Sequence, residues 1–188
     1  MSKAKSVINV STKAGDTGES GLIDGVRLPK SSQIFAVLGD IDELNTWIGY
    51  SLVMLSQKLP EQSAALRHAQ KNLYLLSALI AKADAKKVSV AEEELATLEK
   101  NSLYLQKSMQ QDWTRSFLYP GGTETAARID VTRAVCRRAE RSLVALSQQQ
   151  QVSDIALRYL NRLSDYLYVL RCFVNFKEGY QEAQFDTK

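Results

Sequence analysis

Apolar residues recur at every third or fourth position through most of the chain, which is the spacing of one buried face of an α-helix. This pattern predicts five amphipathic helices with short connections, around residues 41–55, 66–80, 89–109, 123–146 and 157–174. Such helices pack as an up-and-down bundle. Ser89 and Glu92 have the spacing of a capping box, so the third helix is expected to start with these two side chains satisfying each other's backbone N–H groups.

Glycine and proline are placed unevenly and mark the expected connections. Six of the nine glycines lie between Gly15 and Gly49, and the segment from 123 to 178 contains neither glycine nor proline. We therefore expect breaks near Pro60, near 84–89, at Pro120-Gly-Gly and near 148–153. The sequence predicts one all-α domain, with an N-terminal arm (1–35), a helical bundle (36–178) and a tail (179–188); residues 7–10 are expected to form a short extended piece.

Composition narrows the class of protein. A chain of 188 residues is the size of one domain, and 45% hydrophobic residues exclude intrinsic disorder. The sequence contains no apolar run near the ~20 residues of a membrane span and no apolar signal segment at its start. Two cysteines are too few for a disulfide scaffold, so we expect a reducing cytoplasm. A net charge of +3 is too mild to require nucleic acid.

The single histidine excludes several kinds of active site. His68 cannot supply a multi-histidine zinc site, and a Ser-His-Asp triad would depend on it alone. A bundle di-iron site needs two Glu-x-x-His motifs, whereas the residue three before His68 is Ala65. We expect His68 to lie on a helix surface.

The glycine-rich segment before the first helix has features of a phosphate-binding loop. Four glycines within eleven residues allow the backbone to turn its N–H groups inward, and hydroxyls and lysines add donors and positive charge. Asp16 could hold a hydroxyl or a hydrated metal. A flexible polar arm remains the alternative. The candidate residues are Thr12, Lys13, Ala14, Gly15, Asp16, Gly18, Ser20, Gly21 and Lys30.

The predicted fourth helix carries a column of arginines. Arg133, Arg137 and Arg141 are spaced four residues apart and so share one face, suited to phosphate oxygens or carboxylates. The stripe that starts at Val131 is expected to face the core on the other side. Glu140 lies beside the column, where it could orient an arginine or bind a metal through water. A solvated face with ion pairs is the alternative.

Two further polar groups interrupt the apolar pattern. Asp42 and Glu43 lie near the start of the first helix, where the helix dipole favours anions. Asn161-Arg-Leu-Ser-Asp165 brings polar side chains into an otherwise apolar helix. Both groups have a structural alternative, a helix-start acid in the first case and a hydrogen-bond network between helices in the second.

These motifs together resemble a known family, the PduO-type ATP:cob(I)alamin adenosyltransferases. The resemblance spans residues 12–165 and implies a ferritin-like five-helix bundle, assembled as a homotrimer with active sites between subunits. The motifs, in order, are Thr12-Lys-x-Gly-Asp-x-Gly, Asp42-Glu-Leu-Asn, Phe117-x-x-Pro-Gly-Gly, Arg133-x-x-x-Arg-Arg-Ala-Glu-Arg and Asn161-Arg-Leu-Ser-Asp.

The resemblance also implies roles for individual residues. Asp42 and Arg133 match an ion pair between subunits that shapes the corrinoid site, and Phe117 matches an aromatic that packs under the corrin ring and displaces its lower ligand. Mg²⁺ is the expected partner of the triphosphate, with Glu140 as a candidate ligand through water. The implied ATP contacts are Thr12, Lys13, Ala14, Gly15, Ser20, Gly21, Lys30, Arg137, Arg138, Glu140, Arg141 and Asn161.

The implied reaction moves the 5′-deoxyadenosyl group of ATP to the cobalt of cob(I)alamin, with cob(II)alamin as its precursor. A cobalamin reductase and an acceptor enzyme for the product are the implied partners, without nucleic acid or membrane. The chain departs from the family pattern at Ser31-Ser-Gln33, where members carry an acidic stretch. A helical module that binds an acidic partner or nucleic acid, and a catalytically degenerate member, are the alternatives.

Overall fold

The computed structural model describes residues 11, 13–82, 84–109 and 117–185. Five helices account for most of them, as the periodicity predicts: α1 (Gln33–Lys58), α2 (Pro60–Ile80), α3 (Glu92–Met109), α4 (Glu124–Ser147) and α5 (Asp154–Lys177). The two strands that precede them, β1 (Glu19–Gly21) and β2 (Arg27–Pro29), form an antiparallel hairpin. The expected extended piece at 7–10 lies outside the described residues.

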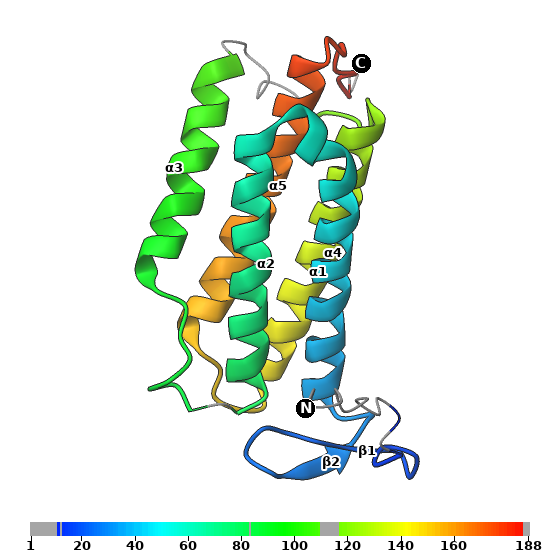
Figure 1. Ribbon diagram of the computed structural model, residues 1–188, viewed down its shortest axis with the longest axis vertical. Coiled ribbons are helices and arrows are strands. Elements are labelled where there is room, and N and C mark those ends of the chain that lie inside the picture. The colour runs from blue at the N-terminus through cyan, green and yellow to red at the C-terminus, as the bar shows by residue number, and fades with distance from the viewer. Residues whose placement is uncertain (1–10, 12, 83, 110–116, 186–188) are drawn as a thin grey trace, which may run out of the picture.

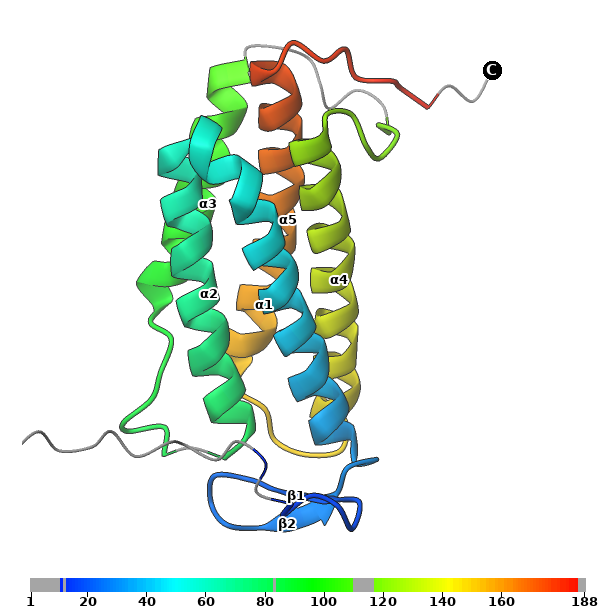
Figure 2. The ribbon, with the colours of Figure 1, turned by 45° about the vertical axis from the view of Figure 1, so that its right-hand side comes forward.

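Successive helices alternate in direction, so the bundle is up-and-down (Figure 1). The order in space differs from the order in sequence, because α4 packs against α1 and α5, while α3 packs along α5 (Figure 2). The hairpin lies beneath the start of α1, and the chain end after α5 lies at the opposite end of the bundle. The two ends therefore carry different segments of the sequence. None of the described helices is long and apolar enough to cross a membrane.

The core is formed by the predicted stripes, with one correction on α4. Val131 is 42% exposed, whereas Cys136 and Thr132 are buried. The buried face of α4 is thus rotated from the one expected from Val131. Thr132 is accommodated because its hydroxyl is paired with Ser51 of α1 at 2.9 Å, so no polar group is left unpaired there.

Of the helix starts expected from the sequence, those near Pro60 and Thr123 are confirmed and two are wrong. α1 begins at Gln33 and has no acidic residue in its first turn, so Asp42 and Glu43 do not lie near its start. Pro60 takes the first position of α2, where a missing N–H costs nothing, and the Thr123 side chain caps α4 by accepting from the Ala126 N–H at 3.4 Å. The capping box in α3 is wrong, because the helix begins at Glu92 itself. The Glu92 carboxylate instead pairs with Arg158 of α5, which also lowers its pKa.

His68 lies on a helix surface as predicted, and both cysteines are buried. Cys136 and Cys172 are buried free thiols, and burial raises the pKa of each, to about 12 for Cys172. Buried thiols of raised pKa are poor nucleophiles. His68 is exposed on α2, with its Nδ1 3.4 Å from Glu94 of α3.

Candidate functional site

The N-terminal turn is folded against the lysine that follows the hairpin. The Lys30 N–H donates to the Gly18 carbonyl at 2.8 Å, and the Lys30 ammonium lies over Gly15, where an added Cβ would be 2.9 Å from its Nζ. Glycine at 15 therefore leaves space for the ammonium group. Two regions that sequence reasoning treated as candidates for one ligand, the turn and Lys30, are thus brought together.

Arg27 holds the turn to the hairpin, a role that the sequence pattern did not reveal. Its guanidinium donates to the Ala14 carbonyl at 2.8 Å and lies 3.5 Å from the Glu19 carboxylate. The amides of Asp16 and Gly18 donate to carbonyls within the turn itself, at 3.2 Å each. In this conformation these two N–H groups are therefore not directed at a ligand. Ser20 pairs with Leu28 and Gly21 with Arg27 across the hairpin, and Thr12 lies outside the described residues.

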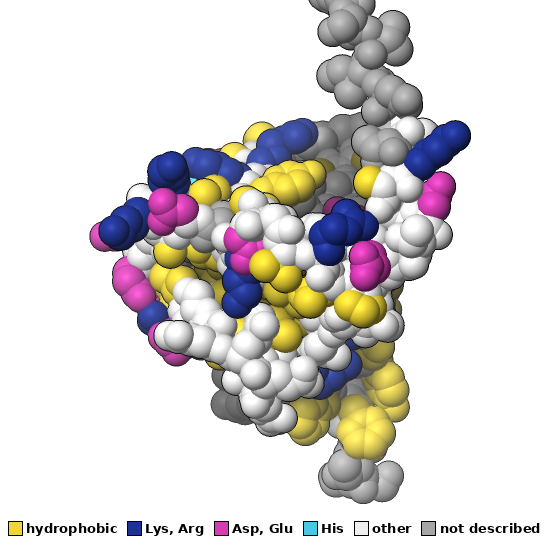
Figure 3. All heavy atoms as spheres, turned by 90° about the horizontal axis from the view of Figure 1, so that it is seen from below, with side chains coloured by type: hydrophobic (Ala, Val, Ile, Leu, Met, Phe, Trp, Pro, Cys, Tyr) yellow, Lys and Arg dark blue, Asp and Glu magenta, His cyan; other side chains and the backbone are white. Residues whose placement is uncertain are grey.

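Four cations at the candidate site have no anionic side chain as partner. Lys13, Lys30, Arg137 and Arg141 are exposed, and none forms an ion pair within the part of the chain that the structure describes. The two arginines are on the half of α4 that leads toward the hairpin end (Figure 1). Seen from that end, lysine and arginine side chains are spread over the surface with hydrophobic ones between them (Figure 3).

Arg138, which lies next to the predicted arginine column in sequence, is already paired within the chain. Arg138 contacts the carboxylates of Asp40, at 3.3 Å, and Glu43 on α1. The hydrogen bond between Arg138 and Glu43 raises the pKa of the first and lowers that of the second. Asp40 also accepts from Ser142. Within one chain, Arg138 therefore joins α4 to α1 and differs from its neighbour Arg137.

Glu140 and Asn161 form a polar link between α4 and α5. The Asn161 amide donates to the Glu140 carboxylate at 3.0 Å, and its oxygen accepts from Arg162 at 3.3 Å. Arg162 in turn pairs with Glu99 of α3 at 2.6 Å. The hydrogen-bond network between helices, given above as the structural alternative for this segment, is therefore present. Among the described residues no three His, Cys, Asp or Glu side chains gather into a metal site, so Glu140 stands as a single carboxylate beside Arg137 and Arg141.

Asp42 and Arg133 are not joined within the described chain. Asp42 is exposed on α1. Arg133 instead contacts Asp130 at 3.2 Å and has its guanidinium 6.0 Å from the centre of the Tyr168 ring. An ion pair between Asp42 and Arg133 would therefore need a second copy of the chain.

Phe117 lies at the other end of the bundle, on a short segment that pairs with the C-terminal tail. The Phe117 ring is 84% exposed. The Phe185 N–H donates to the Phe117 carbonyl at 2.7 Å, and the Tyr119 N–H donates to the Ala183 carbonyl at 2.9 Å. The Tyr119 and Phe185 rings meet edge to face with their centroids 5.9 Å apart. The tail is thus part of the structure around Phe117, which the sequence analysis did not anticipate.

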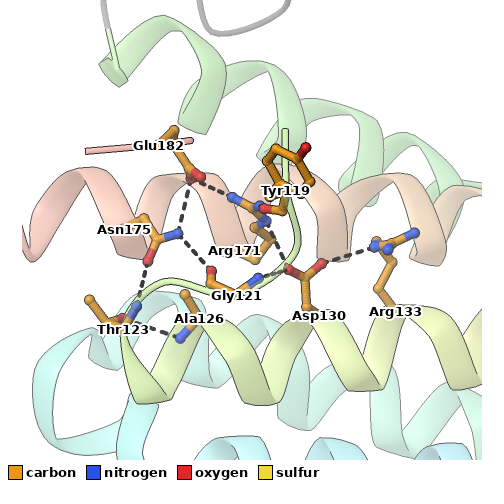
Figure 4. A network of polar contacts seen from close by, with 9 residues as sticks. All are labelled: Tyr119, Gly121, Thr123, Ala126, Asp130, Arg133, Arg171, Asn175 and Glu182. Atoms are coloured by element: carbon orange, nitrogen blue, oxygen red, sulfur yellow. Dashed lines mark hydrogen bonds and ion pairs between the residues drawn. The ribbon is translucent and has the colours of Figure 1, made fainter. Parts of the chain in front are cut away.

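A buried arginine lies beneath this segment (Figure 4). The Arg171 side chain is 1% exposed and contacts the carboxylates of Asp130, at 3.1 Å, and Glu182, as well as the Tyr119 carbonyl at 2.6 Å. Burial favours loss of its proton, but the hydrogen bond with Glu182 and the surrounding negative charge outweigh this, so the pKa of Arg171 is raised. The arginine remains charged and joins α4, the tail and the loop of residues 117–123 that carries Phe117.

Asn175, one turn after Arg171, completes the attachment of the loop to α5. Its amide nitrogen donates to the Gly121 carbonyl and to Glu182, each at 3.0 Å, and its oxygen accepts from the Thr123 N–H at 3.0 Å. The Gly121 N–H donates to Asp130 at 2.9 Å. The sequence does contain a signal for this network, because Arg171 and Asn175 interrupt an otherwise apolar stretch of α5.

Gly122→Ala is expected to be more destabilising than Gly121→Ala, by about 1–3 kcal/mol. Both glycines have a positive φ, 117° at Gly121 and 110° at Gly122, so both variants carry backbone strain. Only at Gly122 would the new Cβ overlap the Asn175 side chain, whereas the space at Gly121 is open. Urea unfolding of the two variants measures the difference, and equal losses would contradict the contact with Asn175.

Comparison with known proteins gives a consistent picture. The family model described as cobalamin adenosyltransferase matches residues 10–174. The chain is 36% identical over 171 residues to a cobalamin adenosyltransferase of Cupriavidus metallidurans, covering 90% of each chain. It is 34% identical over 179 residues to a corrinoid adenosyltransferase of Bacillus subtilis, covering 93% of this chain and 91% of the relative. A variant PduO-type ATP:corrinoid adenosyltransferase from Lactobacillus reuteri, solved with cobalamin and ATP, is similar with a TM-score of 0.87 and 29% identity, over 94% of this chain and 99% of that one.

Proposed function

The chain belongs to the cobalamin adenosyltransferase family, and on that premise we propose that it transfers the 5′-deoxyadenosyl group of ATP to the cobalt of cob(I)alamin. The products are adenosylcobalamin and triphosphate. The cobalt of the substrate supplies the nucleophile, so the protein needs no reactive serine, cysteine or histidine. Two buried thiols and one exposed histidine agree with such a reaction.

The observation that carries this proposal is the set of exposed cations without ion-pair partners among the described residues, Lys13, Lys30, Arg137 and Arg141. Arg137 and Arg141 lie one turn apart on the same face of α4, and like charges at this spacing repel one another unless an anion lies between them. A polyphosphate has the charge and the oxygen acceptors for such a set, and guanidinium groups bind phosphate oxygens in pairs. We assign these four residues, with the remainder of the turn, to the triphosphate of ATP.

Glu140, Asn161 and Arg138 are assigned to the surroundings of the nucleotide. The hydrogen bond from Asn161 fixes the Glu140 carboxylate on the part of α4 that carries Arg137 and Arg141. Mg²⁺ commonly takes one or two carboxylates together with substrate phosphates and retains waters, so a single carboxylate at this position fits the ion. Glu140 would hold Mg²⁺ through water, where the ion neutralises phosphate charge. For Arg138 the pairing with Asp40 and Glu43 favours a role in orienting α4 over direct contact.

The chemical step is a nucleophilic displacement at the 5′ carbon. Cobalt donates an electron pair to form the Co–C bond, the C5′–O bond breaks, and the electron pair of that bond leaves with the triphosphate. Preorganised positive charge at the leaving group stabilises the transition state, and correct orientation of two reactants can supply ~7–11 kcal/mol. The positive charge that stabilises the leaving triphosphate would come from Lys13, Lys30, Arg137 and Arg141.

We further propose that active sites form between subunits of a homotrimer. The start of α4, next to the Phe117 segment, and Arg137 are about 20 Å apart, since an α-helix rises 1.5 Å per residue. A site that uses both Phe117 and the ATP-binding arginines would therefore take them from different subunits. In that assembly Asp42 of one subunit would pair with Arg133 of the next, in competition with Asp130 of its own chain. The enzyme would act in the cytoplasm with a reductase that supplies cob(I)alamin and an acceptor for the product.

The direct test is conversion of the corrinoid. The full chain is mixed with ATP, Mg²⁺ and chemically reduced cob(I)alamin, and the absorption spectrum is followed. Appearance of the light-sensitive alkyl-cobalt spectrum is the expected result. An unchanged spectrum, combined with salt-sensitive binding of RNA or DNA, would instead support a binding module that uses the arginines for nucleic acid.

Phe117→Ala is expected to slow conversion that starts from cob(II)alamin and a reductant by up to about tenfold, the magnitude of one aromatic contact. Conversion that starts from cob(I)alamin should change much less, because the proposed task of the ring is to displace the lower ligand before reduction. The two rates are measured side by side. Tyr74→Ala, which removes an exposed aromatic on α2, is the control. Equal slowing of both reactions would contradict this role.

A further inference from the structure

Backbone pairing, and not side-chain packing, sets the position of Phe117. Because the Phe117 ring is 84% exposed, few protein contacts hold the side chain. Two backbone hydrogen bonds fix the residue. The Phe117 carbonyl accepts from the Phe185 N–H, and the Tyr119 N–H donates to the Ala183 carbonyl. Residues 118 and 184 form an antiparallel bridge between these two bonds. Any movement of the tail therefore moves Phe117.

The tail in turn depends on one carboxylate. Gly179, at φ 70°, turns the chain after α5, and the Tyr180 N–H then donates to the Asn175 carbonyl at 2.9 Å. Beyond that point Glu182 is the residue that the structure ties to α5, through Arg171 and Asn175 (Figure 4). Arg171 and Asn175 also hold the loop, through the Tyr119 and Gly121 carbonyls. Glu182 thus joins the tail to the same two side chains that hold the other side of the Phe117 segment.

We propose that Glu182 is a positioning residue for the corrinoid reaction, which acts through the pairing of the tail with residues 117–119 to fix the place of Phe117. This inference rests on the proposed function of Phe117. It adds a residue that no motif contains, from a segment that the sequence analysis treated as a plain tail. Among the described residues the Glu182 carboxylate contacts Arg171 and Asn175, and these two side chains bond the carbonyls of Tyr119 and Gly121, so its effect on Phe117 is indirect.

The first experiment needs no substrate. Glu182→Gln keeps an acceptor for Asn175 but removes the charge that pairs with Arg171. Hydrogen–deuterium exchange of the peptide containing residues 117–119 is expected to become about tenfold faster, while the hairpin at 19–29 stays unchanged. Glu124→Gln, an exposed carboxylate at the same end of the bundle, is the matched control. Unchanged exchange at 117–119 would overturn the proposal whether or not the protein is an adenosyltransferase.

The second experiment isolates the backbone hydrogen bond. Phe185→Pro and Phe185→Ala both remove the ring that meets Tyr119, but only proline removes the N–H that donates to Phe117. The proline variant should convert cob(II)alamin about two- to tenfold more slowly than the alanine variant, with the KM for ATP the same in both. Equal rates would contradict positioning by the backbone. Neither variant disturbs a buried charge, so this comparison holds even if Glu182→Gln folds poorly.

A double variant shows whether Glu182 acts through Phe117. Glu182→Gln alone should slow the reaction from cob(II)alamin about two- to tenfold and leave the reaction from cob(I)alamin nearly unchanged. In a chain that already carries Phe117→Ala, it should have no further effect, since residues that act as one unit are not additive. An additive loss would overturn the proposal. Failure of the unaltered chain to convert cob(I)alamin would reject the proposed function, while the exchange experiment would still judge the link between tail and loop.

Discussion

Arg171→Ala is expected to lower the free energy of unfolding by about 3–5 kcal/mol, a large part of the stability of a domain of this size. The side chain is 1% exposed and balances the carboxylates of Asp130 and Glu182. Its removal takes the buried positive charge away from both carboxylates and the donor away from the Tyr119 carbonyl, in a site that water reaches poorly. Asp130 keeps Arg133 and the Gly121 N–H, and Glu182 keeps Asn175. The loss comes mostly from negative charge that is no longer balanced in a buried site.

Arg158→Ala is the matched control for this measurement. Arg158 is on the same helix and also pairs with two carboxylates, Glu92 and Asp154, but its side chain is 43% exposed. Exposed pairs contribute about 0–1 kcal/mol, so its replacement should change stability little. Urea unfolding at neutral pH gives both values. Similar losses in the two variants would mean that Arg171 is hydrated in solution and that the network in Figure 4 does not stabilise the loop.

Arg137→Ala is expected to reduce kcat/KM for ATP by about 10- to 150-fold. The range corresponds to the loss of one charge-assisted hydrogen bond to phosphate, about 1.5–3 kcal/mol, at 1.36 kcal/mol for each factor of ten. Folding should be almost unaffected, with a change within about 0.5 kcal/mol, because Arg137 is exposed and forms no ion pair with a described residue. Loss of activity without loss of stability is the signature of a residue reserved for a ligand.

Arg67→Ala provides the comparison for Arg137→Ala. Arg67 is an exposed arginine on α2, away from the turn and from α4, and its replacement should leave the ATP kinetics unchanged. Steady-state rates at saturating cob(I)alamin and varied ATP distinguish the two variants. If Arg137→Ala behaves like Arg67→Ala, Arg137 is not in the nucleotide site. If Arg137→Ala lowers the free energy of unfolding and leaves the ATP kinetics unchanged, Arg137 has a structural role and is not reserved for a ligand.

The fold follows from local information, which is why the sequence predicted it well. A stripe of apolar side chains is a property of each helix by itself, and the breaks at Pro60 and Pro120-Gly-Gly need only neighbouring residues. The same local reasoning misplaced the buried face of α4 at Val131, because Thr132 is buried through a partner on α1 that lies 81 residues away. It also misplaced the start of α3, where Glu92 pairs with Arg158 of α5 and does not take part in a capping box.

The candidate site was harder to predict because its members differ by their partners. Arg137 and Arg138 are adjacent and chemically identical, yet among the described residues Asp40 and Glu43 form ion pairs with Arg138 and not with Arg137. Sequence spacing along α4 cannot separate them. The tail and the Phe117 segment are separated in the sequence by α4 and α5, so no short motif encodes their pairing. The usable signal was chemical: an arginine and an asparagine within the apolar α5 stretch require buried partners.

The burial of both thiols has a practical consequence for following motion in this protein. Cys136 and Cys172 are the two cysteines of the chain, and both are sealed in the core with raised pKa values. Maleimide dyes react with accessible thiolates, so the two native cysteines should remain unlabelled in the folded chain. A cysteine introduced at the surface of the tail would take up a single fluorophore without removal of either native residue, and detachment of the tail could then be watched directly during turnover.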